Sequence, residues 1–318
     1  MKATFEPKRL LPIDGVNADI DRGRLFVEQC EQDYARRIEG CCDAIEAGGR
    51  RIVMLSGPSA SGKTTTTHKL AIEIRSRGYD GFVVSLDDFF LDIEDYPRNE
   101  QGVPDFEHIR ALDVECVNRC LRELVLDGAT DMPVYDFRRQ RRSDEIRHVE
   151  AQEGDFVFIE GIHALNPLLS SSIDPVSIFK IYASLRTEYA KDSARVVATR
   201  DLRITRRLVR DFLARGHSVR TTLELWDRLR EGEEKWIKPF RADADWILDT
   251  SFVYEPALLL PWLEELCLDP ECGGDHRHVL IKLLDQYRLF HPLEQSLVPT
   301  NSMLREFTGG LELAAPGI

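Results

Sequence analysis

What this 318-residue sequence lacks excludes several classes of protein. It has no window of about 18 uncharged apolar residues, so no transmembrane helix is expected. The opening residues, MKATFEPKRLLPIDG, lack the apolar core of a signal peptide. Basic residues are outnumbered, with 42 Lys and Arg against 55 Asp and Glu, and the formal charge is −13. That deficit argues against a general binder of nucleic acids or membrane surfaces.

Cysteine is present in an odd number, seven, which does not suit a disulfide framework. This usage fits a reducing compartment, and we expect a cytoplasmic protein. Cys267, Cys272, His276 and His278 lie close together, but their C-x4-C-x3-H-x-H spacing does not match common zinc sites. A hairpin loop between two helices is the favoured interpretation, with metal binding as the alternative.

The rest of the chain has the pattern of an ordinary globular α/β protein, with 43% hydrophobic and 31% charged residues. Short apolar runs predict strands at 51–56, 82–86, 155–161, 178–184 and 245–251. Helical spacing predicts helices at 17–47, 111–127, 201–215, 220–235, 255–267 and 277–290, and one that follows a glycine-rich turn and runs to about residue 78. Strands that alternate with helices indicate a parallel sheet covered on both faces.

The turn after the first of these strands is Gly57-Pro58-Ser59-Ala60-Ser61-Gly62-Lys63-Thr64, which fits the P-loop pattern G-x-x-x-x-G-K-[ST]. Its glycines allow successive N–H groups to point at phosphate oxygens, and the following helix adds its positive end. We expect Lys63 to reach the β- and γ-phosphates and the Thr64 hydroxyl to bind Mg²⁺. GTPases, motor ATPases and small-molecule kinases share this loop, so other residues are needed to distinguish these classes.

Two acidic positions follow predicted strands at the edge of the sheet that carries the P-loop. Asp87 and Asp88 follow one strand, and Glu160 ends another. In such folds ligands bind at this edge. A carboxylate there can accept the proton of an attacking hydroxyl and also hold the water shell of a metal ion. The alternatives are an acidic helix cap for Asp87 and a solvated strand end for Glu160.

Arginines gather in two segments of this acidic chain. Arg203, Arg207 and Arg210 follow i, i+4, i+7 spacing, which predicts one stripe on a helix. Such a stripe suits the charge that builds on a transferring phosphoryl group, and a solvated face is the alternative. A second basic run at 138–142 follows Pro133-Val-Tyr135-Asp-Phe137, and either an acceptor site or a surface loop fits it.

Taken in order, the motifs GPSASGKTT, SLDDFF, DFEH, PVYDF, FIEGIHAL and DLRITRRLVRDFLARG resemble the uridine kinase branch of the phosphoribulokinase/uridine kinase family. The resemblance covers about residues 50–253. It implies a P-loop kinase-type three-layer sandwich with a five-stranded parallel sheet and an arginine-rich helical lid. Residues 1–49 and 254–318 would then be helical extensions. The later segment VPTNSMLREFTGG also resembles bacterial nucleoside kinases whose longer members carry extra N-terminal domains.

The resemblance implies specific roles for residues that match the family's motifs. Asp87 would be the base on a nucleoside 5′-hydroxyl and would hold Mg²⁺ with Thr64 and Glu160. Residues 57–64 with Thr65, and Asp245 late in the domain, would bind ATP. On the acceptor side, Glu107 stands where uridine kinases have a ribose-binding aspartate. The remaining assignments are Tyr135 beside the base, Arg207 and Arg210 as lid arginines near substrate and phosphates, and Arg215 as another.

Three acceptor-side positions depart from the uridine kinase pattern. Gln140 stands near a histidine of that pattern, Leu225 replaces a glutamine, and His217 replaces an arginine. We therefore expect an ATP-dependent nucleoside kinase of the uridine or cytidine type, and these changes could switch the acceptor. The alternatives are a kinase for a sugar phosphate or pantothenate, and a nucleotide-binding regulatory module. Family members often assemble as oligomers, which leaves a homo-oligomer open for this chain.

Overall fold

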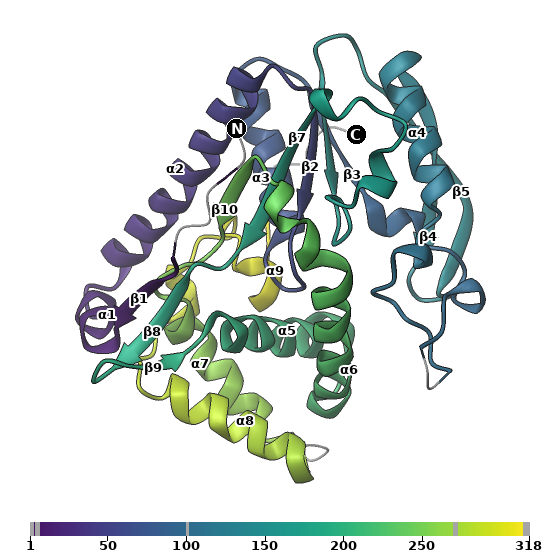
Figure 1. Ribbon diagram of the computed structural model, residues 1–318. Coiled ribbons are helices and arrows are strands. Elements are labelled where there is room, and N and C mark those ends of the chain that lie inside the picture. The colour runs from purple at the N-terminus through teal and green to yellow at the C-terminus, as the bar shows by residue number, and fades with distance from the viewer. Residues whose placement is uncertain (1–2, 4–6, 100–101, 270–272, 314–318) are drawn as a thin grey trace.

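A five-stranded, all-parallel sheet forms the centre of the computed structural model, which describes residues 3, 7–99, 102–269 and 273–313 (Figure 1). The strand order is β10-β7-β2-β6-β3. Each of the five predicted strands is present, and the predicted parallel sheet is confirmed. The strands are β2 (Ile52–Ser56), β3 (Gly81–Ser85), β6 (Phe156–Glu160), β7 (Ile178–Ser184) and β10 (Trp246–Asp249).

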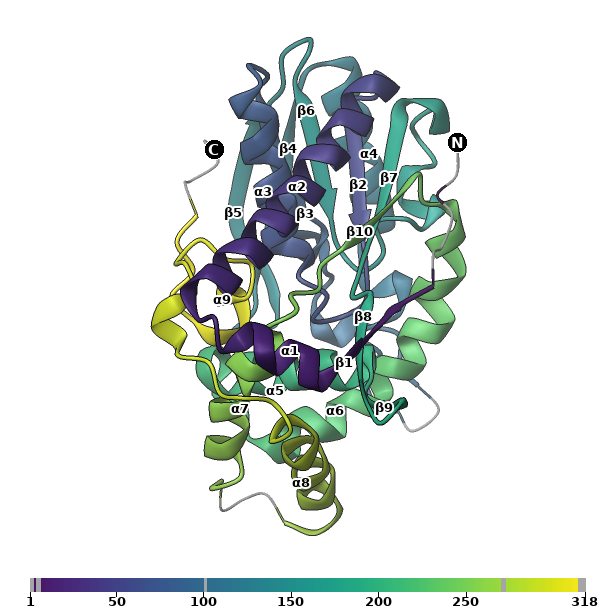
Figure 2. The same cartoon turned by 90° about the vertical axis from the view of Figure 1, so that its left-hand side faces the viewer.

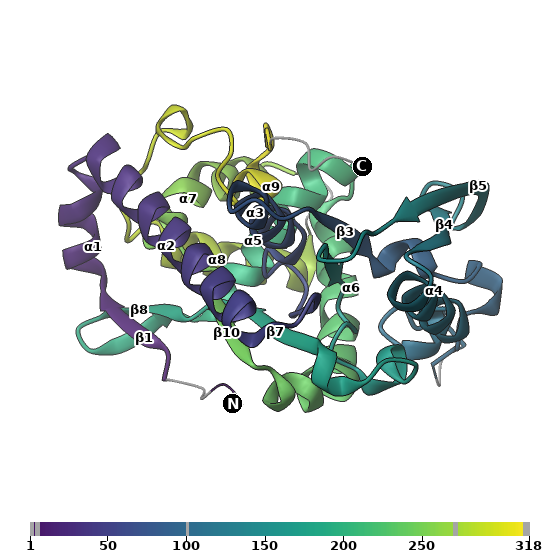
Figure 3. The same ribbon diagram turned by 90° about the horizontal axis from the view of Figure 1, so that it is seen from above.

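Helices cover both faces of the sheet, because its central strands carry apolar side chains in both directions. Val53 and Leu55 of β2 pack into one core cluster, and Ile52 and Met54 into another. The first cluster includes α2 (Arg24–Gly48) and α3 (Lys63–Ser76), and the second includes α4 (Val114–Leu126). Seen from above, α2 and α4 lie on opposite sides of the sheet (Figure 3). This is the expected three-layer arrangement.

Two helices, α5 (Thr199–Arg215) and α6 (Val219–Gly232), cross the carboxyl end of the sheet as the expected arginine-rich pair (Figure 1). The helical path continues through a π-helical turn at Glu233–Ile237 and a 3-10 helix at Lys238–Asp243 before β10 begins. The helix thus changes from α to π at residue 233, before the chain returns to the sheet. π-Helical turns are frequent at functional sites.

Five strands outside the central sheet were not predicted. β4 (Ala129–Asp136) and β5 (Arg141–Glu150) form an antiparallel hairpin, with the basic run 138–142 at its turn. A second sheet contains β1 (Arg9–Pro12), β8 (Thr187–Lys191) and β9 (Ala194–Val197). The sequence of β5, RRSDEIRHVE, is largely polar and exposed, so it carries little of the alternation by which strands are recognised.

The ends of the chain pack on the same core as the sheet. Instead of one helix over 17–47, the structure has α1 (Ile13–Ile20) and α2, separated at Gly23, whose φ of +59° is left-handed. The later helices are α7 (Glu255–Leu266), α8 (Gly274–Tyr287) and α9 (Arg305–Thr308). Figure 2 shows α2 lying along the sheet with α9 near its beginning. The domain limits of 1–49, 50–253 and 254–318 stay a prediction.

No helix among the described residues combines the length and apolar character that a bilayer crossing requires.

Candidate active site

The P-loop leaves the carboxyl end of β2 and enters α3 at Lys63. A Cβ on Gly57 would lie 2.3 Å from the Ala183 carbonyl oxygen, so only glycine fits against β7 there. Gly62 has a φ of +80°, in the left-handed region that glycine tolerates. The Lys63 ammonium folds back and donates to the Pro58 carbonyl at 3.3 Å. The loop thus has the curled form that an anion-binding cradle needs.

Glu160, at the end of β6, is bonded to the start of α3 and to the end of β3. Its Oε1 accepts hydrogen bonds from the hydroxyls of Thr64 at 3.2 Å and Ser85 at 3.0 Å. The Ser85 hydroxyl in turn accepts from the Asp87 backbone N–H at 3.4 Å. The predicted acidic residues and the end of the P-loop therefore meet at one place. Ser85, and not Asp87, caps the short 3-10 helix Leu86–Phe89.

The protonation of these carboxylates reflects their surroundings. Burial raises the pKa of Glu160 to about 7, Asp87 adds to the rise, and Lys63 opposes it. Loss of solvation also raises the pKa of Asp87, with Lys63 again opposing. Asp87 remains exposed at its surface, so water still reaches it, whereas Glu160 is only 3% exposed. A cation nearby therefore favours the ionised form of both carboxylates.

Asp87 and Asp88 are adjacent but face different surroundings. Asp88 forms an ion pair with Arg147 of β5. The Asp87 carboxylate has no hydrogen-bond or ion-pair partner among the residues that the structure describes, and its electrostatic neighbours include Lys63, Arg210 and Arg215. Of these two adjacent acids, it is Asp87 that presents an unpaired carboxylate near the P-loop lysine.

The arginine stripe of α5 faces the P-loop. Arg203 Nε donates to the Ser59 carbonyl oxygen at 2.9 Å, and Arg207 donates to the Ser59 hydroxyl at 2.9 Å. Arg210 lies 3.7 Å from Glu306, and Arg215 lies 3.3 Å from Asp211. The face predicted from i, i+4, i+7 spacing is thus directed at the loop, at least at its first two positions.

Glu233 was not predicted for this site. Its carboxylate accepts the Ser59 backbone N–H at 2.8 Å and pairs with Arg203, and its side chain is 2% exposed. It stands at the first position of the π-helical turn after α6. No pattern in the sequence Arg230-Glu-Gly-Glu-Glu-Lys235 distinguishes this acid from its neighbours.

Glu107 lies against the last residue of α6, Gly232. A Cβ on Gly232 would lie 2.2 Å from the Glu107 Cβ, so the two backbones approach closely. Its Oε2 is buried without a hydrogen-bond partner in the described structure. Burial and the neighbouring Glu233 raise the pKa of Glu107 to about 8, while Arg207 and Lys63 oppose the rise. The Glu107 carboxyl is thus within electrostatic reach of the P-loop lysine and the stripe.

The other residues predicted for the acceptor side lie on the β4–β5 hairpin and on the lid. The Tyr135 hydroxyl is 3.3 Å from that of Tyr96, and its ring packs near Phe90. Gln140 is exposed at the hairpin turn with a φ of +54°. Leu225 is half-buried on α6, and His217 lies 3.9 Å from Asp211.

Asp245 is not brought to the P-loop. It precedes β10, at the amino end of that strand, whereas the P-loop follows the carboxyl end of β2. Its carboxylate accepts from Arg50 at 2.9 Å and from the Lys180 N–H at 2.9 Å. We therefore leave Asp245 out of the site. Arg206 links the residue after β10 to the loop, because it donates to both Thr250 O and Ala60 O.

The cysteine and histidine group is not assembled in the described residues. Cys267 follows α7, and His276 and His278 lie on α8, while Cys272 falls outside the described residues. No set of three or more metal-ligating side chains gathers anywhere in the part of the chain that the structure describes. At the P-loop edge, the hydroxyl of Thr64 and the carboxylate of Glu160 are nonetheless oxygen donors of the kind that Mg²⁺ prefers.

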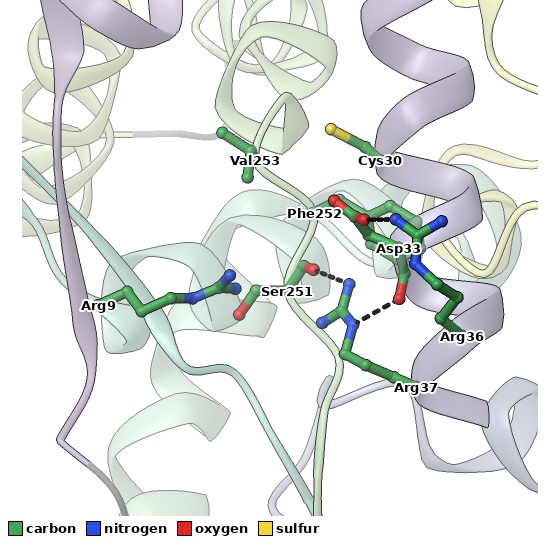
Figure 4. Close-up of a pocket in the computed structure, with 8 residues that line it drawn as sticks. All are labelled: Arg9, Cys30, Asp33, Arg36, Arg37, Ser251, Phe252 and Val253. Carbon is green, nitrogen blue, oxygen red and sulfur yellow. Dashed lines mark hydrogen bonds and ion pairs between the residues drawn. The ribbon is translucent and has the colours of Figure 1, made fainter. Parts of the chain in front are cut away.

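A pocket of about 370 Å³ lies between α2, β1 and the segment after β10 (Figure 4). None of the P-loop residues lines it. Its arginines are bonded within the protein, since Arg37 donates to the carbonyls of Asp249 and Ser251 and Arg9 pairs with Asp249. Its lining residues are Arg9, Cys30, Asp33, Arg36, Arg37, Ser251, Phe252 and Val253.

Comparisons with known proteins agree with this geometry. The family model described as phosphoribulokinase / uridine kinase family matches residues 52–253, and the chain belongs to that family. A uridine kinase of Ligilactobacillus salivarius is 29% identical over 199 residues, which cover 62% of this chain and 84% of that protein. A uridine kinase of Bacillus pumilus is 27% identical, covering 62% and 85%.

A solved structure from Silicibacter sp. TM1040, a "putative fructose transport system kinase", is similar in fold, with a TM-score of 0.50 and 22% identity. It covers 66% of this chain and 98% of that one. The fold and the family together define a P-loop phosphotransferase. This chain is an ATP-dependent small-molecule kinase.

Proposed function

We propose that this kinase transfers the γ-phosphate of ATP to the 5′-hydroxyl of a nucleoside such as uridine or cytidine. The observation that carries the proposal is the unpaired Asp87 carboxylate at the same sheet edge as Lys63, Thr64 and Glu160. Nucleotide binding alone needs no such base, so its presence favours a kinase over a regulatory module. The relatives' activity as uridine kinases supports a nucleoside acceptor.

In the proposed mechanism, Asp87 accepts the proton of the acceptor hydroxyl. The hydroxyl oxygen forms a bond to the γ-phosphorus as the bond from that phosphorus to the bridging oxygen of ADP breaks. Lys63 and Arg207 stabilise the charge on the transferring group. Arg203 and Glu233 hold Ser59 from its carbonyl and N–H sides, so the loop that orients the phosphates stays in position.

Thr64 and Glu160 would hold a Mg²⁺ ion, which supplies charge neutralisation on the phosphate oxygens when bound. Thr64 is an exposed residue, so its hydroxyl can exchange its bond to Glu160 for such a ligand. A cation beside Glu160 would also lower the raised pKa of this carboxyl and so favour its ionised form.

The acceptor would lie between Asp87, Glu107 and the β4–β5 hairpin. We propose Glu107 as the group that binds the ribose hydroxyls, Tyr135 and Gln140 as residues beside the base, and Arg207 and Arg215 as the lid contacts. The departures at Gln140, Leu225 and His217 concern base recognition and leave the phosphoryl-transfer groups in place. They are the reason to test acceptors broadly.

The test is a panel of acceptors given to the purified chain with ATP and Mg²⁺, with ADP release as the readout. Uridine and cytidine are compared with 5′-deoxyuridine, a hexose phosphate and pantothenate. We expect one of the two nucleosides to raise ADP release well above the acceptor-free rate, and 5′-deoxyuridine to have no effect. A panel in which only a non-nucleoside is phosphorylated would overturn the proposed acceptor but not the kinase chemistry.

A further inference from the structure

The C-terminal segment, residues 302–308, lies outside the part of the chain that the family model matches, yet it contacts the P-loop. It contains α9, which lies beside α3 and α5 (Figures 1 and 3). A Cβ on Gly62 would lie 2.5 Å from the Met303 sulfur. Glycine at position 62 therefore serves both the left-handed turn and the close approach of this segment.

Glu306 bonds to the first turn of the P-loop helix. Its Oε2 accepts the Thr65 hydroxyl at 2.6 Å and the Thr65 backbone N–H at 3.4 Å. The first N–H groups of a helix have no partner within the helix and are where anions bind. The other oxygen of Glu306 lies 3.7 Å from Arg210 of the lid helix α5. One carboxylate thus spans the nucleotide loop and the lid.

Phe307 adds an apolar contact to the same lid helix. Its ring, 1% exposed, lies 4.9 Å from the Arg206 guanidinium and 5.9 Å from that of Arg210. Both distances are within the range of cation–π attraction. The segment therefore contacts Arg206 and Arg210 of α5 through its ring, and Arg210 also through its carboxylate.

The segment is itself firmly held. The Arg305 guanidinium donates to the carbonyls of Gln295 at 2.7 Å and Val298 at 2.6 Å. The Ser302 hydroxyl donates to Glu31 of α2 at 2.6 Å, and that glutamate also accepts from Tyr254. A rigid anchor can hold two other elements at a constant distance.

We propose that residues 302–308 are a positioning element of the nucleotide site, in which Glu306 holds the P-loop helix and the lid helix at the spacing that a bound triphosphate needs. This inference rests on the proposed ATP site at the P-loop. Glu306 is a positioning residue and not a catalytic one, since it acts through Thr65 and Arg210. If the Glu306 carboxylate instead repelled the phosphates, it would weaken nucleotide binding.

The test measures ADP and ATP binding by calorimetry, with Mg²⁺ present, on the full chain and three variants. Glu306→Ala removes the hydrogen bonds and the ion pair, so we expect nucleotide binding to weaken by about tenfold. Glu306→Gln keeps an oxygen for the Thr65 hydroxyl but loses the charge, so we expect a loss of about threefold. The matched control, Glu312→Ala, removes an exposed carboxylate nearby and should bind as the wild type.

Tighter binding in Glu306→Gln would show that the carboxylate competes with phosphate and would overturn the proposal. Unchanged binding in that variant would also overturn it. This variant removes no atoms from the packed segment, so it decides the outcome even if Glu306→Ala does not fold. The binding readout needs no acceptor, so it remains decisive if every nucleoside fails as a substrate.

Discussion

Thr64 Oγ1 donates a hydrogen bond to Glu160 Oε1 at 3.2 Å, which joins the start of the P-loop helix to the end of β6. The Leu55 and Ser85 positions pair in register with Glu160 on its two sides, so this carboxylate stands between the strands that lead to the P-loop and to Asp87. The proposed metal-side groups thus come from two neighbouring elements, with Thr64 at the start of α3 and Glu160 at the end of β6.

The first prediction concerns Glu160→Gln. The change keeps the shape of the side chain but removes the negative charge that a Mg²⁺ ion would face. We expect the Mg²⁺ concentration for half-maximal activity to rise by about tenfold or more. A magnesium titration of ADP release measures it, with Glu39→Gln on the exposed face of α2 as the control. Equal magnesium dependence in both variants would rule out Glu160 as a metal-side group.

The second prediction separates the adjacent acids. Asp87→Asn should lower kcat by about 10³-fold, because the acceptor hydroxyl loses its base, while ATP binding remains. Asp88→Asn removes only the ion pair with Arg147 and should change kcat by a few-fold at most. Steady-state kinetics with the best acceptor, and calorimetry with ATP, provide the two measurements. Similar kcat values for the two variants would rule out Asp87 as the base.

Much of the site could be predicted because its determinants are local in sequence. The P-loop pattern fixes its own backbone, and Asp87 and Glu160 follow apolar strands whose carboxyl ends meet in any parallel sheet. The arginine stripe of α5 could also be predicted, since helical spacing alone places Arg203 and Arg207 on one face.

The contacts that escaped prediction depend on tertiary approach. Glu233 is one of several acids after α6, and only the π-helical turn directs it to Ser59. Glu306 lies far along the chain from Thr65, and no periodicity connects them. The β4–β5 hairpin was missed because β5 is mostly exposed and charged, so its pairing with β4 leaves no apolar pattern.

The third prediction concerns the stripe. Arg207→Ala should lower kcat by about 10³-fold, since a guanidinium near the transferring phosphoryl group is lost. Arg207→Lys keeps the charge but not the planar fork, so we expect an intermediate rate. Arg200→Ala, an exposed arginine of the same helix, is the control. If Arg207→Ala and Arg200→Ala are equally active, the stripe serves only to hold Ser59.

The fourth prediction uses the pH dependence of stability. The pKa of Glu107 is about 8 in the fold against an ordinary value of 4.5. Between these values the folded protein holds a proton that the unfolded chain has lost, so this group destabilises the fold progressively as the pH rises. Glu107→Gln cannot titrate. The urea midpoint of the variant minus that of the wild type should therefore increase from pH 5 to pH 8. A difference that stays constant over this range would contradict the raised pKa.

The last prediction concerns the ion pair beneath the lid. Arg206 and Glu255 are fully buried, with guanidinium-to-carboxylate distances of 2.6 Å for both hydrogen bonds. Glu255→Gln leaves the arginine charge uncompensated and should cost about 3–5 kcal/mol of stability. Replacing both residues, as Arg206→Met with Glu255→Leu, should cost much less, because no buried charge remains. Urea denaturation of the three proteins measures this. The exposed pair Arg220 and Glu224 gives the control, where Glu224→Gln should leave the midpoint unchanged. A double variant as unstable as Glu255→Gln would show that packing, and not charge compensation, holds α5 to α7.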